Sequence, residues 1–331
     1  MKPSREIGAF RSLAPCFLIL TLSAPPVSAA DTSGQARAIL AKMAKATRAN
    51  NYDGTFVSIR GADTASMRII HKADSRGEHE RLIALTGTAK EVIRRNDEVI
   101  CIFPNERSVM VDKTMQQAFF GAAWSQPIEQ VAVLYDFSVL GGDRIAGRPA
   151  WVLGIQPKDA DRYSYRLWVD TSSSLLLKSQ VLDGGGSILE QLLFTALETP
   201  AVISESALQA SISGEGYTWY RNETPQASSE PNSGWEVGWL PRGFAMTEQQ
   251  MHDMPKDKKA VKHKVFSDGL ATVSVFIEKN KEQAVPVQGY SAFGALNTYS
   301  TLADGYQITV VGEVPAATVR QIAASVSPAA P

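Results

Sequence analysis

The chain has 331 residues, enough for about two domains of ordinary size, and its residues are 44% hydrophobic and 20% charged. This apolar content is sufficient for folded cores and excludes a wholly disordered chain. The formal net charge of −1 argues against a nucleic-acid-binding protein, because such proteins carry a clear cationic excess or a basic stripe. After residue 30, no apolar run reaches the roughly 18 residues of a transmembrane helix.

The N-terminal end of the chain has the pattern of a secretory signal peptide. Three basic residues precede an apolar segment at residues 13–22, and small residues lead to a cleavage site near Ala29 or Ala30. The apolar segment is too short for a stable membrane span. We therefore expect residues 1–30 to be a cleaved signal peptide, the mature protein to be exported to the periplasm, and Cys101 to be its single, buried cysteine.

The next part of the chain, residues 31–205, alternates between one strong helical pattern and many strand patterns. Residues 34–49 have apolar side chains at helical spacing. Strand patterns bounded by turn residues follow at 52–60, 67–72, 78–85, 90–96, 98–103 and 108–112, and again at 138–145, 148–157, 162–170, 175–182 and 188–197. Between these groups, residues 127–135 are spaced as a second helix. About eleven strands with short connections predict a large antiparallel sheet curved around the helices, a half-open barrel.

The C-terminal part reads as a linker followed by a smaller domain. Residues 206–234 are rich in glycine, proline and serine, which is typical of a linker. In residues 235–331, two hairpins are expected, one from strands 261–266 and 270–278 and one from strands 291–302 and 306–314. Pro315 then opens a terminal helix. The expected fold class is mainly β, of the α+β kind, with two domains.

The residues that carry chemistry in enzymes are scarce and scattered. The four histidines show no metal-ligand spacing, and no nucleophile elbow or phosphate-binding loop is present. The carboxylates Asp159 and Asp161 sit beside Lys158 and Arg162, which indicates a solvated loop and not an acid–base pair. We therefore expect no catalytic residues, no metal site and no cofactor.

Short segments spread over both expected domains resemble the RseB/MucB family of periplasmic regulators of envelope stress. Their order and spacing carry the resemblance, which extends over nearly all of the mature chain. The segments are NYDGTFV at 51–57, ERL at 80–82, GRPA at 147–150, YSYRLWVD at 163–170, WLPRGF at 239–244, SDGLA at 267–271, VSVF at 273–276 and VVGEVP at 310–315.

The resemblance implies both a fold and a function. Family members have an N-terminal half-open barrel similar to the lipoprotein carriers LolA and LolB, and a smaller C-terminal domain. They bind the periplasmic part of a membrane-spanning anti-sigma factor and shield it from site-1 proteolysis. Envelope-stress signals, such as mislocalised lipoprotein or lipopolysaccharide, release it. The alternative is a periplasmic lipid or lipoprotein carrier, although a minimal carrier has no need of the second domain.

Two sets of candidate contact residues follow from the alternation of apolar residues and the placement of aromatic ones. We expect the apolar face of the first domain to contact a lipid or acyl chain through Phe56, Trp124, Leu134, Phe137 and Leu167. We expect the second domain, which carries the densest basic stretch, to contact the protein partner through Trp239, Phe244, Lys258, Lys259 and Phe276. The oligomeric state is left open, with a homo-oligomer among the options.

Overall fold

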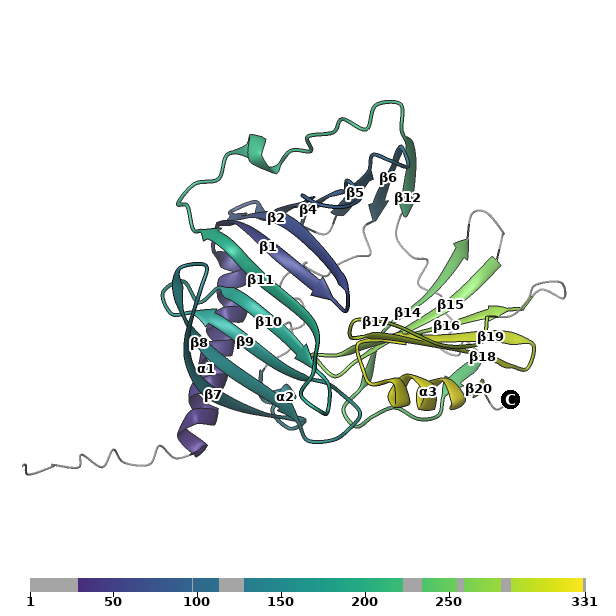
Figure 1. Cartoon of the computed structure of the whole chain (residues 1–331). Coiled ribbons are helices and arrows are strands. Elements are labelled where there is room, and N and C mark those ends of the chain that lie inside the picture. Colours follow the sequence, from purple (N-terminus) through teal and green to yellow (C-terminus); the bar gives the residue numbers. More distant parts are fainter. Residues whose placement is uncertain are drawn as a thin grey trace, which may run out of the picture.

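The structure of the chain, a computed structural model, describes residues 29–96, 98–112, 128–222, 234–254, 259–280 and 287–329. Figure 1 shows a large curved sheet beside helix α1 and a smaller sheet with helix α3 on one face. The larger sheet is not closed, because β12 and β7 form its two edges. This arrangement confirms the expected mainly β fold, with a half-open larger sheet and a smaller antiparallel sheet with a terminal helix.

The larger sheet contains twelve strands in the order β12-β6-β5-β4-β3-β2-β1-β11-β10-β9-β8-β7. Its elements along the chain are α1 (Ala29–Ala49), β1 (Tyr52–Arg60), β2 (Asp63–Asp74), β3 (Gly77–Ala84), β4 (Glu91–Arg95), β5 (Glu98–Phe103), β6 (Ser108–Asp112), α2 (Ile128–Val131), β7 (Tyr135–Ile145), β8 (Arg148–Pro157), β9 (Ser164–Asp170), β10 (Leu176–Leu182), β11 (Ile188–Glu198), the 3-10 helix η2 (Glu205–Leu208) and β12 (Thr218–Asn222). Neighbouring strands are antiparallel except β12 and β6, which run parallel.

The smaller part contains a six-stranded antiparallel sheet in the order β14-β15-β16-β19-β18-β17 and a two-stranded pair, β13 and β20. Its elements are β13 (Trp235–Val237), β14 (Ala245–Met254), β15 (Lys259–Ser267), β16 (Thr272–Lys279), β17 (Gly289–Phe293), β18 (Leu296–Ala303), β19 (Tyr306–Gly312), α3 (Ala316–Ala324) and β20 (Val326–Pro328). Helix α3 packs its apolar stripe, including Val319 and Ile322, against the buried valines and isoleucines of this sheet.

Helix α1 forms where the sequence predicts it and fills part of the concave face of the larger sheet. Ala36, Leu40 and Met43 recur at helical spacing and are fully buried against side chains of β7, β8 and β9. The helix begins at Ala29, within the last two residues of the expected signal peptide, and residues 1–28 lie outside the described part of the chain. No helix in the described ranges is long and apolar enough to span a membrane.

Two local expectations are wrong, and tertiary pairing explains both. The helical pattern at 127–135 gives only the single turn α2, because Tyr135 begins the edge strand β7 and pairs with Pro157. The expected strand 291–302 is divided by a turn at Gly294, whose φ of +61° favours glycine, into the hairpin β17–β18. Regular alternation does not show where such a turn interrupts a strand.

The segment after β11 lies on the convex face of the larger sheet. Its apolar side chains Ile203 and Leu208 pack on Ile70, and β12 then extends the sheet beside β6. This segment overlaps the start of the expected linker at 206–234, of which residues 223–233 lie outside the described part of the chain.

Cys101 lies on β5 within the main core, as expected. Burial raises the pKa of its thiol, so it is a packing residue and not a reactive thiolate.

Candidate functional site

An apolar cavity of about 340 Å³ opens on the concave face of the larger sheet. It is lined by side chains of β1, β2, β3 and β11 and by one residue of the smaller domain, namely Phe56, Ser58, Arg60, Asp63, Thr64, Ala65, Met67, Leu82, Leu192 and Phe293. A volume of this size is at the lower end of the range for small-ligand pockets.

The strand register explains why these side chains gather. Phe56 pairs with Met67, and Ser58 pairs with Ala65 on one side and Leu192 on the other. Residues opposite each other in antiparallel strands project to the same face of a sheet. Helix α1 packs mainly on the β7–β9 part of this face, and the cavity lies beyond it, at the end of β1 and β2 near the turn that joins them.

The rim of this cavity is also a contact between the two domains. Arg60 of β1 forms an ion pair of 3.3 Å with Glu190 of β11, and its guanidinium lies 5.9 Å from the centre of the Phe293 ring. Oε1 of Glu190 accepts a hydrogen bond of 3.0 Å from the backbone N–H of Ala295. The turn of the β17–β18 hairpin is therefore held against the larger sheet beside the cavity.

A second contact between the domains is a buried ion pair. The Nη1 atom of Arg162 donates to Oδ2 of Asp268 at 2.6 Å, and both side chains have an exposed fraction of 0%. The hydroxyl of Tyr135 donates to the same oxygen at 2.8 Å, because burial, with the nearby Tyr165 and Asp268, raises its pKa and keeps it protonated. The guanidinium also donates to the backbone oxygen of Arg242 at 2.6 Å. These bonds anchor the turn after β15 to the larger domain.

A stacked histidine–tyrosine pair lies on the concave face within the larger domain, at the end of β1 and β2 away from the cavity. His71 stacks on Tyr52 with ring centres 4.6 Å apart, and its Nδ1 atom is 2.8 Å from the carbonyl oxygen of Asn50. Burial lowers the pKa of His71, which favours the neutral imidazole, although the carboxylates Glu80 and Glu78 act in the opposite direction.

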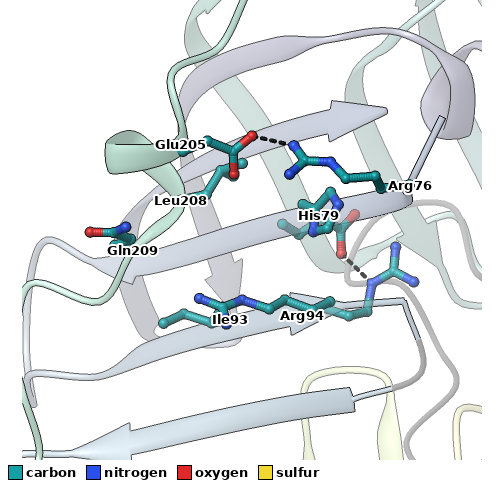
Figure 2. A pocket seen from close by; sticks show the side chains of 9 residues that line it. Arg76, His79, Ile93, Arg94, Glu205, Leu208 and Gln209 are labelled. Carbon is teal, nitrogen blue, oxygen red and sulfur yellow. Dashed lines mark hydrogen bonds and ion pairs between the residues drawn. The ribbon is translucent and has the colours of Figure 1, made fainter. Parts of the chain in front are cut away.

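A second cavity, of about 260 Å³, lies where η2 packs over β3 and β4, and Figure 2 shows its lining. Arg76 is paired with Glu205, and Nε of Arg94 donates to Glu80 at 2.8 Å. Two of the arginines that line it are thus paired with carboxylates of the chain. We interpret it as part of the attachment of η2 to the sheet.

The structure separates the residues expected to contact an apolar ligand. Phe56 lines the apolar cavity. Leu134, Phe137 and Leu167 are buried in the cluster under α1 and do not line it. Trp124 lies outside the described residues. The two groups differ because the helix fills only one part of the concave face.

The residues expected to contact a protein partner are also dispersed. Trp239 is half-buried against the core of the smaller domain, and Phe244 is buried with its ring centre 5.4 Å from the Arg162 guanidinium. Phe276 is half-buried on the sheet face opposite α3, where its ring stacks on His263 at 4.3 Å. Lys258 and the side chain of Lys259, the first residue of β15, lie outside the described part.

Sequence reasoning missed the residues that join the domains. Phe293 sits in an expected strand with no sign of a cavity, and Arg162 stands in a segment interpreted as a solvated loop. The sequence predicts a hairpin turn at residues 267–269, but nothing in it indicates that the Asp268 carboxylate pairs with a distant arginine. Among the described residues, no group of three or more His, Cys, Asp or Glu side chains could hold a metal ion.

Two family models match the chain and together span most of it. The model of the MucB/RseB N-terminal domain matches residues 35–212, and that of the MucB/RseB C-terminal domain matches residues 229–327. The sigma factor AlgU regulatory protein MucB of Pseudomonas aeruginosa is 34% identical over 314 residues, which cover 93% of this chain and 95% of MucB. The sigma-E factor regulatory protein RseB of Escherichia coli K12 is 27% identical over 305 residues, 90% of this chain and 92% of RseB.

Solved structures agree with these matches. The complex structure of Pseudomonas aeruginosa MucA/MucB is similar with a TM-score of 0.72 and 32% identity, over 90% of this chain and all of that chain. A crystal structure of MucB in complex with MucA(peri) is similar with a TM-score of 0.69 and 32% identity, over 89% of this chain and all of that chain. With both domains matched in order and over nearly their whole length, the chain belongs to the MucB/RseB family.

Proposed function

We propose that this chain is an exported regulatory protein that binds the periplasmic part of a membrane-spanning anti-sigma factor. The observation that carries the proposal is the similarity to MucB across both domains, since MucB has been solved in complex with MucA(peri). In this proposal the bound anti-sigma factor is shielded from site-1 proteolysis. A binder of this kind needs complementary surfaces and no catalytic group.

The smaller domain offers a partly apolar surface suited to a protein partner. On the sheet face opposite α3, the stacked rings of His263 and Phe276 lie among the half-buried side chains of Val261, Val265 and Val311. The strand register places polar side chains on the same face, namely Ser274, Glu278 and Thr309. Aromatic side chains within an apolar surface commonly provide much of the free energy of protein association. This surface supports Phe276 as a partner contact.

The apolar cavity supports a role in release by an amphipathic ligand, such as lipoprotein acyl chains or lipopolysaccharide. A ligand changes partner binding only if it binds the partner-free and partner-bound forms with different affinities. The cavity borders the smaller domain through Phe293, so its occupancy can affect that domain.

The test uses the mature chain, residues 31–331, and the periplasmic segment of the anti-sigma factor encoded by the same genome. Isothermal titration calorimetry should show a saturable complex. Phe276→Ala should weaken the complex about tenfold or more, as expected for a central aromatic contact. Trp151→Ala is the matched control, because Trp151 is an exposed aromatic residue of the larger sheet far from the proposed surface. Absence of binding by the full mature chain would refute the proposal.

A second arm tests shielding. The site-1 protease should cleave the isolated anti-sigma segment faster than the same segment in the complex. Equal cleavage rates at saturating concentrations of the chain would leave the binding proposal intact and refute the shielding function.

A periplasmic lipid carrier is the second candidate, and the apolar cavity favours it. A carrier should transfer acyl ligands to acceptor vesicles without any anti-sigma factor. If the chain transfers ligand and binds no anti-sigma segment, the carrier function replaces the regulatory one.

A further inference from the structure

One wall of the apolar cavity comes from the other domain. Phe293 ends strand β17, and its side chain lines the cavity together with Phe56, Ala65 and Met67 of the larger sheet. Phe293 has an exposed fraction of 46%, so the chain does not cover its side chain completely and a ligand can reach it. Any molecule that fills the cavity therefore touches both domains.

The position of Phe293 is set by its own hairpin turn. Glu190 accepts the hydrogen bond from the Ala295 N–H while it pairs with Arg60. A Cβ atom at Gly294 would lie 2.6 Å from Oε1 of Glu190, so only glycine allows the carboxylate this close to the turn. Glu190 is thus a positioning residue for the cavity wall.

The lining indicates the chemistry of the occupant. Most of the inner wall is apolar, which suits a hydrocarbon chain, and the cavity is large enough for a small ligand. Arg60 stands at the rim with its side chain 47% exposed, but it is paired with Glu190, and Asp63 also lines the cavity, so the rim carries no excess of positive charge. The apolar wall and the size of the cavity favour a single acyl chain.

We propose that this cavity is a two-domain acyl-chain site in which Phe293 is a direct ligand contact and the docked β17–β18 hairpin is required for tight binding. The inference rests on the apolar-ligand part of the proposed function. Because coupling is reciprocal, a ligand that binds better to the docked hairpin also stabilises docking by the same free energy. The smaller domain thereby senses ligand bound on the larger sheet.

The first experiment measures displacement of the apolar dye N-phenyl-1-naphthylamine from the mature chain by dodecanoate. Phe293→Ala should weaken dodecanoate binding about fivefold, since the apolar contact of the Phe293 ring with the ligand is lost. Phe293→Leu, which keeps an apolar side chain, should retain most of the affinity. Leu302→Ala is the control, because Leu302 is an exposed apolar residue of the neighbouring strand that does not line the cavity. Ala65→Trp, which fills the cavity from the larger sheet, should abolish displacement.

The second experiment measures hydrogen exchange at the Ala295 amide, whose hydrogen bond to Glu190 reports hairpin docking. Dodecanoate should slow this exchange in the unsubstituted chain and in Leu302→Ala, and have little effect in Phe293→Ala. Thermal unfolding of each variant shows that it is folded before binding is compared.

The outcomes separate the two levels of the hypothesis. Suppose that Ala65→Trp abolishes dodecanoate binding but Phe293→Ala binds as tightly as Leu302→Ala. The two-domain site is then refuted, although the cavity still binds the ligand. The same conclusion follows if dodecanoate leaves the rate of hydrogen exchange at the Ala295 amide unchanged or increases it. If the unsubstituted chain does not bind, or Ala65→Trp binds normally, the cavity is not the ligand site, and both proposals about ligands fail while anti-sigma binding is unaffected.

Discussion

Removal of the Asp268 carboxylate should destabilise the protein strongly, because it removes one of the two carboxylates that pair with Arg162, whose side chain has no access to water. Asp268 accepts four hydrogen bonds. Its Oδ2 receives those of Arg162 and Tyr135, and its Oδ1 receives the backbone N–H groups of Leu270 and Ala271, both at 2.8 Å. Asp268→Ala removes all of them.

The expected loss in the free energy of unfolding is about 3–5 kcal/mol, the usual cost of breaking a buried ion pair by truncating one partner. Arg162 would remain with an exposed fraction of 0%, supported by Asp159 at 2.9 Å and by the carbonyl oxygen of Arg242. These remaining partners place the expected loss near the lower end of that range. A loss of this size is a large part of the stability of a typical domain.

Urea unfolding followed by circular dichroism and tryptophan fluorescence measures the loss. The control is Asp136→Ala, which removes an exposed ion pair with Lys158 at 3.5 Å and should cost about 0–1 kcal/mol. Because Asp268 joins the two domains, its variant should also separate the unfolding transitions of the domains. The double variant of Asp268→Ala with Arg162→Met should cost less than the two single variants added together.

If Asp268→Ala costs no more than Asp136→Ala, the Arg162–Asp268 pair is solvated in solution and the expected loss is refuted. If the two single losses add fully, Arg162 and Asp268 do not interact, and the buried ion pair is refuted as well.

Three further predictions concern single positions. Cys101 should react with a thiol reagent only on unfolding, since burial raises its pKa; rapid modification of the native protein would contradict this. Burial lowers the pKa of His71 in the native state, so below about pH 6.5 the unfolded chain takes up a proton while the native imidazole stays neutral. The free energy of unfolding should therefore fall between pH 7.5 and pH 5.5. In His71→Phe this fall should be smaller. Gly243→Ala should lower the free energy of unfolding by about 1–2 kcal/mol because of its left-handed backbone, and by about 1–3 kcal/mol more because the new methyl group overlaps Leu134. Gly305→Ala has open space around it and should lose only the first amount. Urea unfolding of both variants measures the difference. Equal losses for the two glycines would show that the contact relaxes freely.

The local pattern of the sequence determined the elements and the class of the fold. Period-two alternation and turn residues located most strands, and helical spacing located α1 and α3. These patterns involve residues that are close together in the sequence, so they can be recognised without knowing which distant segments pack against them. They failed where pairing with a distant strand decided the outcome, as at Tyr135, which begins an edge strand and does not continue α2.

The tertiary structure alone decided which apolar residues face a cavity. Phe56, Phe137 and Leu167 are all apolar residues of inward-facing strand positions, yet only Phe56 lines the cavity, whereas Phe137 and Leu167 are buried against α1. Arg162 and Asp268 likewise read as polar turn residues, although 106 positions of chain separate two groups that meet in a buried ion pair. Burial depends on what packs against a surface, and the packing partner here comes from another part of the chain, so no local pattern could contain it.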